Sequence, residues 1–183
     1  MESFHMRWAK IARLNTAAIA FVGLFTSMYM LYEYVTGGEI VCALVSGCEV
    51  VRASGWAWPL GIPLPLFGVL FYLAVFFWLV IRATTPTPRW FLMLGRINIV
   101  LGFLISILLT FVEWLDIKQF CFWCLVSAGC SALIFILMFF DRVPREQEGR
   151  STQELRNYFI TLLLFLVIGT PMFLWLTNYL HNG

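Results

Sequence analysis

Charged residues are scarce in this chain: they make up 12% of its 183 residues, whereas soluble domains average about 25%. This scarcity excludes a water-soluble globule, and a hydrophobic content of 61% excludes disorder, which requires low hydrophobicity. The net charge is only +2, so the chain has no broad basic face for nucleic acid. Histidine is scarce too, because His5 and His181 are the only two and lie near the ends. A histidine general base in the interior of the fold is therefore not expected.

Long apolar runs are abundant instead, and crossing a bilayer takes about 20 residues of helix. We expect five spans, at about 14–35, 64–82, 90–114, 119–140 and 157–180. The second helix should start only after Pro63, since proline is tolerated in the first turn of a helix but not in its interior. The third span requires Arg96 and Glu113 to reach opposite interfaces. The sequence thus predicts a single all-α membrane domain over 1–183, with a loop at 36–62.

The positions of the basic residues predict the orientation. Arg52 and Lys118 fall on one side of the predicted spans and the other ten on the opposite side: Arg7, Lys10, Arg13, Arg82, Arg89, Arg96, Arg142, Arg145, Arg150 and Arg156. Because basic residues favour the cytoplasmic side, we expect a cytoplasmic N-terminus, with loop 36–62 and the C-terminus outside the plasma (inner) membrane. The first apolar run lacks a small-x-small cleavage pattern, which favours an uncleaved span over a signal peptide.

Four of the five cysteines are expected at the external face. Cys42 and Cys48 lie in loop 36–62, and Cys121 and Cys124 open the fourth span. The start of a helix stabilises a thiolate, so the second pair is expected to be a reactive dithiol. The short segment between Cys42 and Cys48 could present one sulfur outward and the other to Cys121, passing electrons by disulfide exchange. Cys130, which lies deeper, is expected to be an inert core residue.

The four external cysteines are also compatible with two non-catalytic roles. They could form structural disulfides, or they could hold zinc, although the five-residue spacing between Cys42 and Cys48 is unusual for a zinc site. The carboxylates nearest to the second cysteine pair are Glu113 and Asp116. They could supply protons to a reaction, or they could be an interfacial pair beside Lys118.

The order and spacing of four motifs resemble the vitamin K epoxide reductase family, in particular its bacterial thiol-oxidising branch. The motifs are Cys42-x5-Cys48, Ser54-Gly55-Trp56, the run from Gly61 to Gly68, and Cys121-Phe122-Trp123-Cys124. The resemblance covers about 12–140. It implies a four-helix bundle around a quinone, either ubiquinone or menaquinone, with a fifth transmembrane helix beside it, and it implies no metal.

The resemblance also implies roles for individual residues. Cys124 would lie nearest to the quinone, Cys121 would exchange with Cys48, and Cys42 would meet an external partner. The quinone pocket is expected to include Ser54, Trp56, Pro63, Leu64, Phe67 and Ala128.

The implied activity is that of a quinone-dependent thiol oxidoreductase that reoxidises a soluble thioredoxin-fold protein and so drives disulfide formation in exported proteins. Many bacterial relatives continue into a thioredoxin-like domain, but this chain stops at Gly183, so we expect the partner to be separate. The alternatives are a quinone or quinone-epoxide reductase and a non-catalytic scaffold with structural disulfides. Vertebrate relatives carry Tyr where this chain has Ala128 and Asn where it has Leu64. The loss of these hydrogen-bonding groups weakens the case for epoxide reduction.

Overall fold

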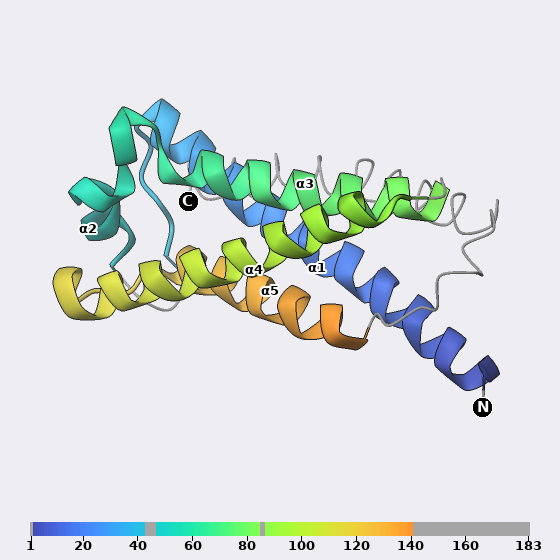
Figure 1. Cartoon of the computed structure of the whole chain (residues 1–183). Coiled ribbons are helices and arrows are strands. Elements are labelled where there is room, and N and C mark those ends of the chain that lie inside the picture. The colour runs from blue at the N-terminus through green and yellow to red at the C-terminus, as the bar shows by residue number, and fades with distance from the viewer. Residues whose placement is uncertain (1, 43–46, 85–86, 141–183) are drawn as a thin grey trace.

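The computed structural model of the protein describes residues 2–42, 47–84 and 87–140, and the regular structure in these ranges is helical. Its four long helices are α1 (Glu2–Thr36), α3 (Leu64–Thr84), α4 (Arg89–Val112) and α5 (Phe122–Phe140). They pack into a bundle in which α1 runs obliquely to α3 (Figure 1). This arrangement confirms the predicted all-α fold, while the fifth span expected at 157–180 lies outside the described residues.

Within the part of the chain that the structure describes, three helical segments are long and apolar enough to cross a membrane: Ile11–Thr36, Leu64–Thr84 and Arg89–Ile117. The fourth apolar segment, Phe122–Met138, is shorter. α3 begins at Leu64, directly after Pro63, and carries Pro65 in its first turn, where a missing N–H leaves no helical bond unmade.

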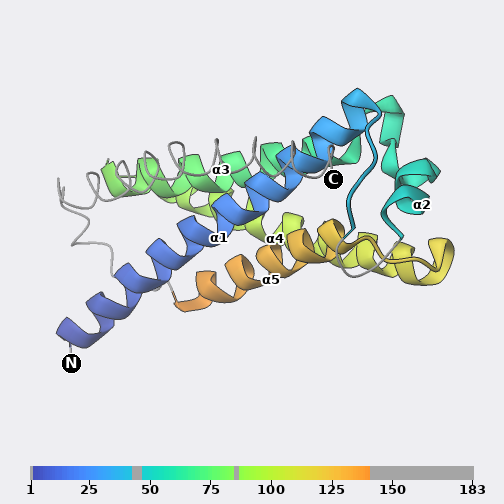
Figure 2. The same cartoon turned by 180° about the vertical axis from the view of Figure 1, so that it is seen from behind.

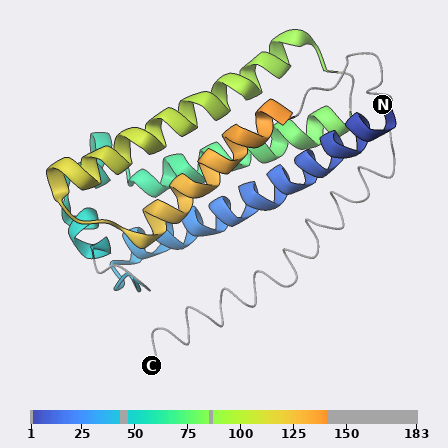
Figure 3. The ribbon, with the colours of Figure 1, turned by 90° about the horizontal axis from the view of Figure 1, so that it is seen from below.

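Helix α1 packs against α3 and α5, and α4 packs against α3 and α5 (Figures 2 and 3). The centre of this bundle is filled by fully buried apolar side chains, among them Val75, Ile99 and Ile134. Tyr72 is buried with them, and its hydroxyl donates to the carbonyl oxygen of Ser127 at 2.7 Å. This bond joins α3 to α5 and satisfies the one polar group that burial of the ring brings inside.

Short helical elements cover the end of the bundle that lies far from the N-terminus (Figure 1). They are α2 (Cys48–Ala53), η1 (Gly55–Ala57) and η2 (Pro59–Gly61), and they occupy much of the segment 36–62 that the sequence predicted as a loop. A second buried cluster lies beneath them, formed by Tyr29, Met30, Tyr34, Ile40, Cys48, Val51, Ala57 and Cys121. The cysteine-bearing segments thus pack as part of a core instead of lying free on the surface.

The connection between α4 and α5 folds back tightly on itself. A π-helical turn, η3 (Glu113–Ile117), ends α4, and Lys118 then adopts a left-handed backbone conformation with φ of 55°. The N–H groups of Lys118 and Gln119 both donate to the carbonyl oxygen of Glu113. The chain therefore returns over the end of α4 and places Cys121 immediately before α5.

Candidate functional site

The structure brings Cys42, Cys48, Cys121 and Cys124 together at the end of the bundle that the short helical elements cover, here called the capped end. Cys42 and Cys48 form a disulfide with a Cα–Cα distance of 6.4 Å, while Cys121 and Cys124 are free thiols. The Sγ atom of Cys121 lies 3.4 Å from the Sγ atom of Cys48. A free thiol next to a disulfide sulfur is the arrangement that thiol–disulfide exchange requires. Residues 43–46, which were expected to be a flexible loop, lie outside the described residues.

The sulfur atoms differ in their access to water. Cys48 and Cys121 are 1% and 0% exposed, whereas Cys42 is only partly buried. An external thiol can therefore reach Cys42 more easily than Cys48. Cys130 is a buried thiol in the central core, among the side chains of α1, α3 and α5.

The position of Cys121 at the start of α5 favours its thiolate. A hydrogen bond from the Cys124 side chain, together with bonds from the backbone N–H groups of Cys124 and Trp123, holds the pKa of the Cys121 thiol below its ordinary value, although burial opposes this shift. Of these bonds, the two from backbone N–H groups are the contribution of a helix N-terminus.

A close backbone approach holds the two cysteine segments together. A Cβ atom added at Gly47 would lie 2.5 Å from the carbonyl oxygen of Phe120, closer than real Cβ contacts come. Only glycine therefore lets the residue before Cys48 pass this close to the residue before Cys121.

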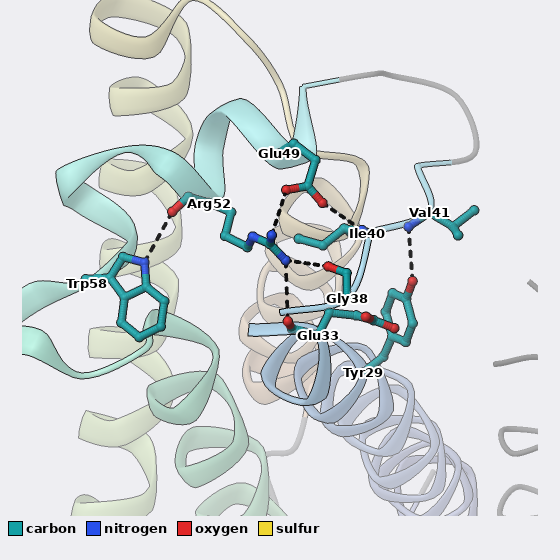
Figure 4. A network of polar contacts seen from close by, with 8 residues as sticks. All are labelled: Tyr29, Glu33, Gly38, Ile40, Val41, Glu49, Arg52 and Trp58. Carbon is teal, nitrogen blue, oxygen red and sulfur yellow. Dashed lines mark hydrogen bonds and ion pairs between the residues drawn. The ribbon is translucent and has the colours of Figure 1, made fainter. Parts of the chain in front are cut away.

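Side chains from three helices fasten the extended strap that carries Cys42, defined as residues 38–42. From α2, Glu49 accepts the N–H of Ile40 at 2.7 Å, and Arg52 donates to the carbonyl oxygen of Gly38 at 2.5 Å (Figure 4). The same two side chains form an ion pair at 3.1 Å. Side chains of α2 thus satisfy two of the backbone polar groups of the strap, which belongs to no sheet.

Two further hydrogen bonds hold the strap at Val41. Its N–H donates to the hydroxyl of Tyr29 on α1 at 3.2 Å, and its carbonyl oxygen accepts from the indole N–H of Trp123 on α5 at 2.8 Å. Trp123 lies inside the Cys121–Cys124 motif, so one residue joins the motif directly to the segment that ends at Cys42. The sequence gives no signal for this role of Trp123 or Tyr29, because the bond from Trp123 joins residues 82 positions apart.

A cavity of about 540 Å³ lies beside Cys124 within the bundle. Its wall is mainly apolar and is formed by α1, α3, α4, α5 and the covering elements. Polar side chains interrupt this wall at several points, among them Glu113 at the capped end, Asn98 on α4 and Ser127 on α5. The size and the apolar wall with few polar groups are typical of a site for a small apolar molecule.

Most of the residues expected in the quinone pocket line this cavity. Trp56, Leu64, Phe67 and Ala128 do so. Ser54 and Pro63 are not among the lining residues. The hydroxyl of Ser54 instead donates to the carbonyl oxygen of Val51 at 2.6 Å, and Pro63 precedes the first turn of α3.

The structure separates the two carboxylates that the sequence treated as a pair. Glu113 is 4% exposed and accepts the backbone N–H of Cys121 at 3.2 Å through Oε2. Asp116 is exposed and accepts the indole N–H of Trp56 at 2.7 Å. The π-helical turn produces this difference, since it directs one carboxylate toward the motif and the other toward the covering elements. The sequence carries no clear signal for this turn.

The donor atoms also bear on the zinc alternative. Cys42 and Cys48 are bonded to each other, and among the described residues no group of three or more His, Cys, Asp or Glu side chains is arranged to hold a metal ion. The arrangement instead supports exchange between sulfur atoms next to an apolar cavity.

Comparison with known protein families agrees with this chemistry. Residues 14–139 match the model of the vitamin K epoxide reductase family, so the match covers more than half of the chain. Members of this family are membrane oxidoreductases that generally use quinone-type electron carriers. This match and the four ordered cysteines place the chain in the vitamin K epoxide reductase family.

Proposed function

We propose that the protein is a quinone-dependent thiol oxidase that reoxidises a soluble thioredoxin-fold protein and thereby drives disulfide formation in exported proteins. The observation that carries this proposal is the 3.4 Å separation between the free Cys121 thiol and Cys48 of a disulfide. The partly buried Cys42 completes that disulfide on one side, and Cys124 lines the cavity on the other.

The first exchange begins outside the bundle. A thiolate of the partner attacks Cys42, forms a mixed disulfide with it and releases Cys48 as a thiolate. The second thiolate of the partner then attacks its own mixed-disulfide sulfur and leaves as an oxidised partner, so that Cys42 and Cys48 are both reduced.

The second exchange takes place between the two buried sulfur atoms. Cys48 attacks Cys121 of a Cys121–Cys124 disulfide and releases Cys124. Cys42 then attacks Cys48, which restores the Cys42–Cys48 disulfide and releases Cys121. The disulfide and the two free thiols of the structure correspond to the state after this step.

The residues around the cavity fit a quinone, either ubiquinone or menaquinone. A largely apolar wall suits the ring and its hydrocarbon tail, and Cys124 lies on that wall. When bound there, a quinone supplies an acceptor for two electrons and two protons. Trp56, Leu64, Phe67 and Ala128 would contact it. Aliphatic side chains at Leu64 and Ala128 favour thiol oxidation over epoxide reduction, because they offer no hydrogen bond to a ring oxygen.

The orientation belongs to the same proposal. We place the capped end, with its cysteines, outside the plasma membrane, and the opposite end of the bundle, with Arg82, Arg89 and Arg96, at the cytoplasmic face. The cysteine end then meets an oxidising compartment in which disulfides persist.

The test is quinone reduction by the full chain in proteoliposomes, with a reduced thioredoxin-fold dithiol protein as donor. We expect consumption of ubiquinone-1 only when the dithiol is present, abolished by Cys121→Ser and kept by the matched control Cys130→Ala. Consumption that survives Cys121→Ser would contradict the proposal.

A trapping experiment tests the first exchange separately. We expect Cys48→Ser, presented with the oxidised partner so that the first exchange runs in reverse, to accumulate a mixed disulfide. The Cys42 thiolate attacks the partner disulfide, and Cys48, whose sulfur would displace the partner, is missing. Cys42→Ser should give no such adduct. An adduct formed equally by both variants would assign the contact with the partner to another residue.

A further inference from the structure

We infer that Glu113 is a further catalytic residue: its carboxylate takes the proton of the Cys124 thiol when the Cys121–Cys124 disulfide forms. The inference rests on the proposed function and adds a proton acceptor to it.

The Glu113 side chain lies between the cysteine motif and the cavity. It is 4% exposed, it lines the same cavity as Cys124, and Oε2 accepts the N–H of Cys121 at 3.2 Å. The Cys124 side chain interacts with this carboxylate. The carboxylate is thus bonded to the backbone of Cys121 and shares the edge of the cavity with Cys124.

The acid at this position is not explained by its hydrogen bond to the backbone. Burying a carboxylate is unfavourable unless the charge or the proton has a use. A glutamine would accept the same bond from the Cys121 N–H without that penalty. Asp116, three residues further on, shows the contrast, because it is exposed and bonded to Trp56. The burial of Glu113 therefore points to a use for its proton.

Several titratable groups face this carboxylate. Cys121 immediately before α5, Cys124 on α5 and Tyr34 on α1 all interact with it electrostatically. Arg52 on α2 acts on Tyr34 and is itself engaged by Glu49 and by the strap. Of these groups, Cys124 is the thiol on the cavity wall, so we expect the proton that Glu113 accepts to come from Cys124.

Electrons and protons balance in this step. A Cys121 thiolate and a Cys124 thiol become a disulfide and lose two electrons to the quinone, which is the oxidant of the proposed function. The proton leaves Sγ of Cys124 for Oε1 of Glu113, the oxygen that the Cys121 N–H does not engage. Glu113 then releases this proton into the cavity, where quinone reduction consumes two protons, and the second comes from the aqueous side.

The decisive variant is Glu113→Gln, which keeps an oxygen for the Cys121 N–H but cannot take a proton. The first readout is alkylation of Cys124 by iodoacetamide at neutral pH, followed by mass spectrometry. We expect this rate to rise several-fold, because the negative charge facing the Cys124 thiolate is gone. The second readout is dithiol-dependent quinone reduction, which we expect to fall about 10²-fold, at the lower end of what general acid–base catalysis contributes.

Two further variants complete the test. Asp116→Asn removes an exposed carboxylate from the same turn and should leave both rates unchanged. Glu113→Asp keeps the acid on a shorter side chain and should retain more quinone reduction than Glu113→Gln. A purely structural role for Glu113 predicts instead that Glu113→Gln, which preserves the hydrogen bond, is the milder change.

The outcomes separate this step from the proposed function. If the wild-type chain is active but Glu113→Gln leaves either the Cys124 alkylation rate or the rate of quinone reduction unchanged, the role of Glu113 is overturned and the proposed function stands. A wild-type chain without dithiol-dependent quinone reduction overturns the proposed function and this step with it.

Discussion

Substituting alanine for Gly47 should slow the exchange between the two cysteine pairs without altering either pair chemically. Gly47 has φ of −81°, a conformation that alanine adopts freely, so the substitution introduces no backbone strain. The added Cβ, however, would lie 2.5 Å from the carbonyl oxygen of Phe120. The effect of the substitution is therefore steric and acts on the distance between the two segments.

The size of the effect follows from this contact. To move from 2.5 Å to the 3.4 Å at which ordinary contact begins, the segments must separate by about 0.9 Å. Cys48 follows Gly47 directly, so its sulfur moves away from Cys121, to which it is now 3.4 Å distant. A displacement of about 1 Å from a reactive geometry reduces rates by about 10²-fold. We expect the exchange to slow by this factor.

The assay is a single-turnover reaction with a reduced dithiol partner, quenched with acid and alkylated so that the redox state of each cysteine is read by mass spectrometry. Gly55→Ala is the matched control, because a Cβ there would meet nothing within 4 Å. The Cys42–Cys48 disulfide should still form in Gly47→Ala. Exchange at the wild-type rate in a folded Gly47→Ala protein would refute the argument that this approach sets the sulfur–sulfur distance.

Three other changes test separate parts of the site. Trp123→Phe keeps an aromatic ring but loses the indole N–H that holds the strap, which costs about 1 kcal/mol. Oxidation of the partner should therefore slow about fivefold, measured as the initial rate at which the partner forms its disulfide. Cys124→Ala removes the hydrogen bond that lowers the pKa of the Cys121 thiol, so the pH profile of Cys121 alkylation should move to higher pH, whereas Cys130→Ala should leave it in place. Tyr72→Phe removes the hydrogen bond from α3 to the Ser127 carbonyl oxygen of α5, which keeps its helical bond, and should destabilise the fold by about 1 kcal/mol, seen as a lower Tm in detergent with unchanged Cys121 alkylation.

The parts of the site that the sequence predicted are those that local rules determine. Apolar run lengths predicted helices that overlap α1, α3, α4 and α5, although α1 begins at Glu2, well before the predicted start at 14. The place of Cys121 beside the start of a helix accounts for the backbone bonds that help to lower its thiol pKa. The motif order pointed to the family, which the match over residues 14–139 confirms. Each of these inferences uses neighbours in sequence, so no tertiary contact was needed.

The parts that the sequence did not predict depend on contacts between distant residues. α2 forms within the predicted loop because Cys48 and Val51 pack into a core with side chains of α1 and α5. The separate environments of Glu113 and Asp116 depend on a π-helical turn and on the left-handed Lys118. A carboxylate near the end of an apolar run has the same appearance in sequence whether it faces solvent or a cysteine pair.

The cysteines of the proposed relay become more buried from Cys42 inward, and this gradient affects which thiols can reduce the relay. Cys42 is partly buried, while Cys48 and Cys121 are almost completely enclosed. External thiols can therefore reduce the relay through Cys42, but they cannot easily reach the buried sulfurs directly. If this enclosure were lost, small thiols could reduce Cys121–Cys124 without the partner, and quinone would be consumed without oxidising exported proteins. Under the proposed function, packing of the strap and α2 over the sulfur pair would couple electron flow to the protein partner. Buried contacts and side-chain hydrogen bonds hold this covering segment in place.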